Sequence, residues 1–254
     1  MTYEEGIEQL NWQAQPPPPV RRRKWPLRLV IVLLVLAGLF VAADRIAVGV
    51  AESQIAKRVQ TSQNLAAKPS VTISNFPFLT QLIGMKLDHV SMDARGVVRN
   101  GIRVSDLHVD LNGVAPSDGF KQAKVDQLSG IAFFSWADLE AAAATQGLND
   151  LTLAAGPDNT IRVTGPIAGL GKVTLQSRLG LGPDNRLQLT ASKVETSVPG
   201  LAGRIPKELD FPLPLGGLPM NLTLELNDLK TSADGLRVRA EADNVTITSS
   251  GISG

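Results

Sequence analysis

The sequence contains no cysteine, and aromatic residues make up only 4% of its 254 residues. The lack of cysteine excludes disulfides and cysteine-ligated metal sites, so the fold must be held together by its apolar core. Because aromatics are scarce, that core must be built from Leu, Val, Ile and Ala. A chain of this length can bury such a core without covalent help.

An excess of charge of one sign is also absent from most of the chain. The first 43 residues carry five basic and three acidic side chains, which leaves 20 basic and 21 acidic residues for the rest. Nucleic-acid binding draws most of its affinity from basic side chains on phosphates. A nearly neutral domain without a basic stripe therefore excludes nucleic acid as a partner.

Residues that support catalysis are scarce as well. The only two histidines, His89 and His108, occur in strand-like patterns without a partner at metal-ligand spacing, and we interpret both as strand-surface residues. Nucleophile-elbow, phosphate-loop and dinucleotide motifs are missing. We predict no catalytic residue, no metal site, no cofactor and no enzymatic activity. Scattered carboxylates leave a hydrolase or a glycosyl-transfer accessory as a distant alternative.

The N-terminal region has the pattern of a membrane segment. Four prolines end a polar stretch, and the basic cluster Arg21–Lys24 then precedes the uncharged run Leu29–Ala43. Positive charge directly before an apolar segment follows the positive-inside rule, and Trp25 lies where an interfacial ring is expected. We therefore predict insertion into the cytoplasmic membrane with the N-terminus in the cytoplasm.

This pattern divides the chain into three parts. We predict a disordered cytoplasmic tail over residues 1–24, a transmembrane signal anchor over residues 25–43, and an extracytoplasmic (periplasmic) domain over residues 44–254. Small residues before Ala43 leave cleavage after that residue as the alternative to an uncleaved anchor.

The apolar spacing after the anchor predicts one helix followed by strands. Apolar residues recur every three or four positions over residues 44–66, which predicts an amphipathic helix that ends at Lys68-Pro69. Its predicted apolar face consists of Val48, Ala51, Ile55 and Val59. From residue 70 onward apolar residues alternate with polar ones, which predicts an antiparallel sheet with one apolar face.

Local motifs place two hairpins and a second helix in this part. Gly-Pro-Asp-Asn turns predict hairpins over residues 151–164 and 173–191. An alanine-rich stretch over 136–146 predicts a helix that Ser135 caps and Gly147 closes. A sequence echo relates residues 76–104 to 211–238, so we expect two related strand-rich layers.

Two apolar segments, residues 76–85 and 211–220, contain proline in a context that is not strand-like, and the three prolines and two glycines of the second are incompatible with a regular central strand or helix. Such segments either plug the end of a domain or line an opening for an apolar ligand or a bilayer surface. The candidate lipid-binding residues are Phe76, Phe78, Leu79, Leu82, Ile83, Phe211, Leu213, Leu215 and Leu218.

Five parts of the chain carry a resemblance to a known family: the anchor, the Val48–Val59 helix, the segment Ser74–Leu79, the loop Leu209–Pro214 and the strand Gly235–Val238. Together they resemble the LmeA-like family of actinobacterial phospholipid-binding envelope proteins. The resemblance implies an α+β, mostly antiparallel fold like the tubular lipid-binding proteins, in which a long curved sheet wraps a helix around an apolar cavity. It implies binding of phospholipid, of the phosphatidylinositol type, in cell-envelope assembly.

These observations favour a non-enzymatic protein that binds or shuttles phospholipid at the outer face of the cytoplasmic membrane. Its expected partners are phospholipid and the membrane itself, with envelope proteins as further candidates. The alternative is a structural or interaction module that docks on a partner protein through the same apolar loops.

Overall fold

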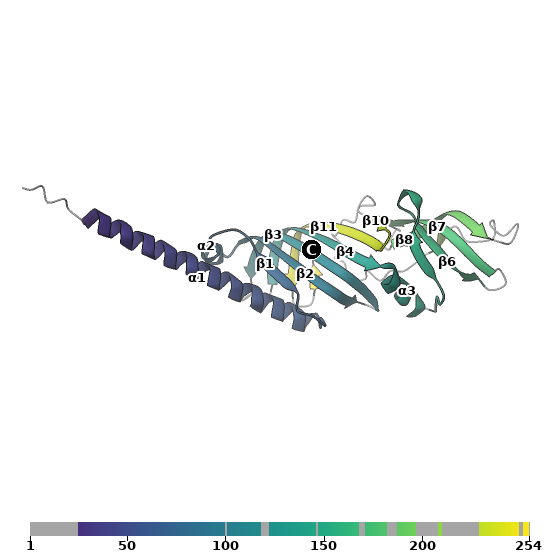
Figure 1. Ribbon diagram of the computed structural model, residues 1–254, viewed down its shortest axis with the longest axis horizontal. Coiled ribbons are helices and arrows are strands. Elements are labelled where there is room, and N and C mark those ends of the chain that lie inside the picture. The colour runs from purple at the N-terminus through teal and green to yellow at the C-terminus, as the bar shows by residue number, and fades with distance from the viewer. Residues whose placement is uncertain are drawn as a thin grey trace, which may run out of the picture. The chain divides into compact units, whose positions relative to one another are not determined.

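The computed structural model describes residues 25–99, 101–117, 122–145, 147–167, 171–181, 187–196, 208–209, 229–248 and 251–253 (Figure 1). The chain forms two compact units, Met1–Val41 and Ala42–Gly254. The predicted tail over residues 1–24 and the whole of the apolar segment 211–220 lie outside the described residues.

A single helix, α1 (Trp25–Ser62), contains both the apolar segment and the predicted amphipathic helix. Residues 25–43 are exposed and apolar, and at 1.5 Å per residue they extend about 28 Å, close to the thickness of a bilayer core. The helix predicted over residues 44–66 is confirmed as the C-terminal part of α1, but it ends four residues earlier than predicted. The helix ends at Ser62, and Asn64 then adopts a left-handed conformation (φ 50°) that α-helical backbone does not allow.

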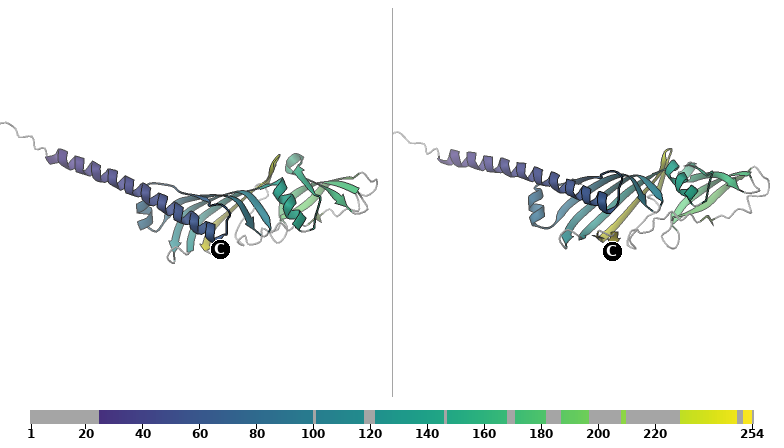
Figure 2. Two further views of the ribbon diagram at one scale, coloured as in Figure 1. Left: turned by 60° about the horizontal axis from the view of Figure 1, so that its bottom comes forward. Right: turned by 90° about the horizontal axis from the view of Figure 1, so that it is seen from below.

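The first sheet has seven antiparallel strands in the order β1-β2-β3-β4-β11-β10, with β12 paired to β11. Its members are β1 (Ser70–Ile73), β2 (Leu87–Arg99), β3 (Ile102–Ser117), β4 (Gln122–Ser135), β10 (Leu229–Ser232), β11 (Gly235–Thr248) and β12 (Gly251–Ser253). The short helix α2 (Phe78–Ile83) connects β1 to β2. The C-terminal part of α1 runs alongside these strands (Figure 2).

The second sheet has five antiparallel strands in the order β5-β6-β7-β8-β9. Its members are β5 (Thr152–Ala155), β6 (Ile161–Ile167), β7 (Gly171–Leu181), β8 (Leu187–Thr196) and β9 (Glu208–Leu209). Both predicted hairpins are confirmed by the β5–β6 and β7–β8 pairings. In the first turn, Asp158 and Asn159 have φ of 52° and 58°, the left-handed geometry for which Asp and Asn are suited.

The predicted alanine-rich helix is also confirmed as α3 (Trp136–Thr145). The Ser135 hydroxyl accepts a hydrogen bond from the Asp138 N–H at 3.1 Å, which is the expected N-cap. Gly147 follows with φ 85°, and its N–H donates to the Ala144 carbonyl.

Two apolar clusters form the core. The first, which we call the α1 cluster, places one face of α1 against the first sheet. Its buried members are Val48, Ala56, Val71, Ile73, Phe78, Leu87, Val90, Val114, Val125, Leu128, Ala242 and Val245. The predicted helix face is confirmed, because Val48 is buried, Ala51 and Ile55 pack against the cluster, and Val59 is half-buried. An antiparallel sheet with a helix on one face is thus the observed architecture.

The second cluster, which we call the α3 cluster, joins α3 to strands of both sheets. Its buried members are Ile102, Phe134, Trp136, Leu139, Ala142, Ile161, Val163, Val173, Leu175, Leu229, Leu236 and Val238. The indole N–H of Trp136 donates to the carbonyls of Ser232 and Ala233, each at 3.1 Å.

The two layers expected from the sequence echo are not observed in the described residues. Ile102–Val104 begins β3 and Leu236–Val238 begins β11, and both strands pair with β4 in one sheet. The strands that begin with the echoed segments, β3 and β11, therefore flank β4 in one sheet. The remainder of the second copy lies outside the described residues.

Candidate functional site

The segment Phe76–Met85, which we call the α2 segment, contains the five candidate lipid-binding residues that the structure describes. They divide by burial. Phe78 is 3% exposed and belongs to the α1 cluster, and Leu79 and Leu82 pack against that cluster. Phe76 and Ile83 are 56% and 84% exposed. The four other candidates, Phe211, Leu213, Leu215 and Leu218, lie outside the described residues, so no arrangement with the α2 segment is stated for them.

Local backbone geometry makes the α2 segment a compact loop around one helical turn and a half. Asn75 and Met85 bound it with left-handed φ values of 73° and 50°, and the Phe76–Pro77 peptide is cis. The Gln81 amide donates to the carbonyls of Asn75 and Ser74 at 3.1 and 3.4 Å, and its oxygen accepts from the Asp88 N–H at 3.0 Å. One side chain thus fastens both ends of the loop.

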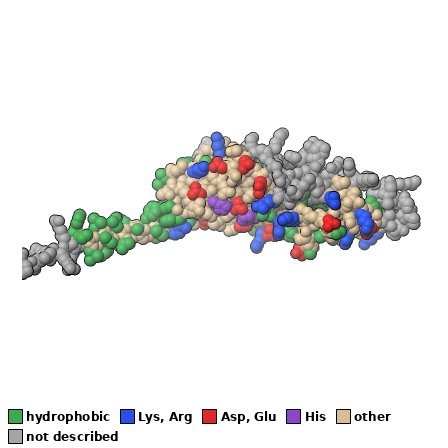
Figure 3. Space-filling view, turned by 90° about the horizontal axis from the view of Figure 1, so that it is seen from above, with side chains coloured by type: hydrophobic (Ala, Val, Ile, Leu, Met, Phe, Trp, Pro, Cys, Tyr) green, Lys and Arg blue, Asp and Glu red, His purple; other side chains and the backbone are tan. Residues whose placement is uncertain are grey.

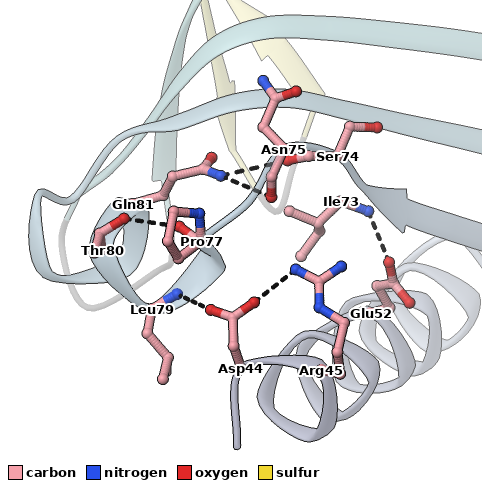
Figure 4. Close-up of polar contacts among 10 residues, drawn as sticks. All are labelled: Asp44, Arg45, Glu52, Ile73, Ser74, Asn75, Pro77, Leu79, Thr80 and Gln81. Carbon is pink, nitrogen blue, oxygen red and sulfur yellow. Dashed lines mark hydrogen bonds and ion pairs between the residues drawn. The ribbon is translucent and has the colours of Figure 1, made fainter. Parts of the chain in front are cut away.

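A buried carboxylate attaches this loop to α1. Asp44, the residue directly after the uncharged run, is 0% exposed. Its Oδ1 accepts the Leu79 N–H at 2.8 Å and its Oδ2 pairs with the Arg45 guanidinium at 2.6 Å (Figure 4). Pro77, at the N-cap of α2, provides no side-chain cap, so Asp44 caps this helix from another element.

The charge state of Asp44 follows from these contacts. Burial by itself raises the pKa of a carboxyl group. Here the hydrogen bonds from the Leu79 N–H, the Arg45 guanidinium and the Phe78 N–H outweigh burial and hold the pKa of Asp44 below its ordinary value. Asp44 is therefore a carboxylate at neutral pH, and it stays available as an acceptor for α2.

Arg45 also contacts the exposed part of the α2 segment. Its guanidinium carbon lies 5.2 Å from the centre of the Phe76 ring, within the range of a cation–π interaction. The sequence prediction omitted Asp44, Arg45 and the 45%-exposed Met85. An acidic residue placed immediately after a long uncharged run was the one available signal, but its partner is 35 residues away along the chain.

A hollow of about 410 Å³ lies between α1 and β1. Its lining residues are Gly49, Glu52, Ser53, Ala56, Lys68, Pro69, Ser70 and Val71. At its rim, the Lys68 ammonium donates to the Ser53 hydroxyl at 3.0 Å, and Glu52 accepts the Ile73 N–H at 2.8 Å (Figure 4). This hollow is open and partly polar, so it is not the enclosed apolar cavity that the resemblance implied, and that cavity stays a prediction.

The two histidines lie on the surface of the first sheet, as predicted. His89 is on β2 and His108 on β3, and their side chains are 32% and 41% exposed. Asp110 contacts both rings, and the His108 Nδ1 lies 2.7 Å from Asp93. Figure 3 shows the histidine side chains, in purple, beside acidic side chains, in red, on the surface. The Asp93 hydrogen bond raises the pKa of His108 above its ordinary value. No group of three metal-ligating side chains suited to an ion occurs among the described residues.

These features define a class: an α+β protein in which a helix backs an antiparallel sheet, with one helix long and apolar enough to cross a membrane among the described residues. That helix fits either an anchor or a signal sequence. Residues 42–241 match the family described as LmeA-like phospholipid-binding. The match covers most of the chain and begins where the second compact unit begins, so the chain belongs to this family. No curated protein and no solved structure matches it.

Proposed function

We propose that this protein binds phospholipid through residues 44–254 and shuttles it at the outer face of the cytoplasmic membrane during envelope biogenesis. The observation that carries the proposal is the match of residues 42–241 to a phospholipid-binding family. The exposed apolar helix over residues 25–43 supports a location beside the bilayer. The phosphatidylinositol type is the head group that we propose first.

The energetics favour exchange without chemical work. Removing two acyl chains from water is worth on the order of 20 kcal/mol at about 0.8 kcal/mol per CH₂ group. A lipid that passes from a bilayer to an aliphatic protein surface exchanges one apolar environment for another, so the net change is small. Uptake and release then need only a path that keeps the chains out of water, and no catalytic group takes part.

The candidate lipid contacts follow from this proposal. Phe76 and Ile83 are exposed and accessible to an incoming acyl chain, whereas Phe78, Leu79 and Leu82 connect them to the apolar face of the first sheet. Phe211, Leu213, Leu215 and Leu218 complete the proposed set. A second candidate function is docking of an envelope protein on the same exposed residues, since exposed apolar side chains serve protein contacts equally well.

A transfer assay tests the proposal. The full chain is reconstituted in donor liposomes that contain a fluorescent phosphatidylinositol and a quencher lipid, and acceptor liposomes are added. We expect faster loss of quenching than with protein-free donors, with a smaller effect for labelled phosphatidylcholine. Transfer at the protein-free rate would contradict shuttling. Equal rates for both lipids would contradict the head-group preference alone.

A further inference from the structure

The α2 segment contains three of the large apolar side chains that the described residues leave exposed. Phe76, Ile83 and Met85 are 56%, 84% and 45% exposed within a stretch of ten residues. Single exposed apolar residues are common on protein surfaces and need no explanation. Three on one short segment, which also buries Phe78 beneath them, form a surface that water alone does not favour.

The contact between the α2 segment and Asp44 indicates what covers this surface. Asp44 is the residue that follows the uncharged run Leu29–Ala43, and its carboxylate accepts the Leu79 N–H of α2 at 2.8 Å. The backbone of α2 is therefore one hydrogen bond away from the end of the apolar segment. If residues 25–43 cross a bilayer, Asp44 lies at the level of the head groups, and α2 is held at the same level.

The neighbouring polar groups fit the same level. Arg45 stacks on Phe76, and Lys86 follows Met85 with its side chain 56% exposed. Basic side chains beside aromatic and aliphatic ones are typical of the interfacial region, where the apolar parts enter the acyl boundary and the charges stay among the head groups. Asp44 and Asp126 pair with these two cations, so the surface does not depend on anionic lipid.

We propose that the α2 segment is a membrane-docking element whose exposed side chains, Phe76, Ile83 and Met85, enter the phospholipid surface next to the anchor. Asp44 is its positioning residue, because it fixes α2 to α1 without touching lipid. The inference rests on the proposed function in one respect, which is that residues 25–43 lie in a bilayer. The proposal assigns these three residues to the bilayer surface and does not depend on the path that a bound lipid takes through the domain.

A depth measurement on the full chain tests this proposal. Because the sequence has no cysteine, Ile83→Cys gives a single site for an environment-sensitive fluorophore. Val98→Cys on β2 is the matched control, since Val98 is also an exposed aliphatic residue, at 62%. Both variants are reconstituted in phosphatidylcholine–phosphatidylglycerol vesicles that contain a nitroxide-labelled phospholipid.

We expect the fluorophore at position 83 to be quenched several-fold more strongly than the one at position 98, with a blue-shifted emission. Equal quenching at the two positions would overturn the proposal and would leave a protein partner as the occupant of this surface. Phe76→Ser and Met85→Ser, made in the Ile83→Cys chain, should lower its quenching. They remove exposed side chains, so circular dichroism should stay unchanged.

The role of Asp44 has its own readout. Asp44→Ala in the Ile83→Cys chain should reduce quenching and increase protease cleavage within residues 76–85, while the spectrum of the sheet stays intact. Quenching that is unaffected by Asp44→Ala would overturn the positioning role. Strong quenching together with no lipid transfer would contradict shuttling and support docking, whereas transfer without quenching would contradict docking alone.

Discussion

The two apolar clusters of the domain each have a helix fastened to an edge strand in the same way, and they differ in what the neighbouring loops leave exposed. In the α1 cluster, Glu52 of α1 accepts the N–H of Ile73 on the edge strand β1 at 2.8 Å. In the α3 cluster, Glu140 of α3 accepts the N–H of Leu153 on the edge strand β5 at 2.6 Å. Each glutamate satisfies an edge amide that would otherwise be free to pair with another chain.

The difference lies in the loops next to these helices. Beside α1, the α2 segment keeps three exposed apolar side chains on a loop that a buried carboxylate fixes in place. Beside α3, the turn residue Asn159 uses its amide to bind the β10 backbone at Leu229 and Thr231, so this loop is fastened inward. The α2 segment therefore presents three exposed apolar side chains, whereas the Asn159 turn is held against β10.

The largest expected effect is in the α3 cluster. Leu236 is 1% exposed within the α3 cluster, and Leu236→Ala should lower the free energy of unfolding by about 2–5 kcal/mol through lost burial and a residual cavity. Urea denaturation measures this change. Leu148→Ala, at a site 42% exposed, is the control. Equal midpoints for the two variants would mean that the α3 cluster does not stabilise the domain.

Glu52 and Glu140 provide a matched test of the hydrogen bond that each helix makes to an edge strand. Glu52→Ala and Glu140→Ala should each cost about 1–2 kcal/mol, because each leaves one backbone N–H without its charged acceptor. Hydrogen exchange should accelerate at Ile73 in the first variant and at Leu153 in the second. Glutamine at either position keeps an acceptor and should restore most of the protection. Acceleration at both amides in either variant would contradict two independent contacts.

A smaller effect is expected from pH. Because Asp93 raises the folded-state pKa of His108, the stabilising contribution of the charged ring is complete below the unfolded pKa of about 6.5. It is lost as pH rises through the raised folded pKa. The ring is partly exposed, so the loss should be modest. Denaturation midpoints of the natural chain and His108→Gln should converge as pH rises through neutrality, and a constant difference would contradict this assignment.

The smallest effect on stability is expected in the α2 segment. Phe76→Ser and Ile83→Ser remove side chains that are already in contact with water, so the unfolding midpoint should change by less than about 0.5 kcal/mol. The same variants should slow lipid transfer. A large loss of stability would show that these residues pack as part of the fold, and it would remove the contrast between the α2 segment and the Asn159 turn.

The features that the sequence predicted are those set by neighbours along the chain. Ser135 caps α3 because its hydroxyl reaches an amide three residues away, and Asp158 and Asn159 form their turn through their own backbone preference. Alternation within 102–111 predicted β3 because Val104, Val109 and Leu111 pack against the two apolar clusters. The apolar face of α1 was predicted for the same reason, since its period follows from the helix itself.

The features that the sequence did not predict depend on distant partners. Asp44 caps α2 from 35 residues away, and β4 pairs with β11 across more than a hundred residues. Nothing in the composition of residues 76–85 distinguishes buried Phe78 from exposed Phe76, because the orientation of a short helix is fixed by what it packs against. The candidate site chosen by residue type therefore stays a prediction, and the sequence did not divide its described members into buried and exposed residues.

The central claim is that this domain binds phospholipid, and the lipid content of the purified protein tests it most directly. Residues 44–254, secreted without residues 1–43, would be extracted with organic solvent and analysed by mass spectrometry, with quantification against the protein. The account predicts phospholipid in a fixed molar ratio to the protein, and loss of that phospholipid when Phe76, Ile83, Leu213 and Leu215 are all replaced by Ser in a chain that still folds. An extract free of phospholipid, together with no uptake from labelled liposomes, would contradict it.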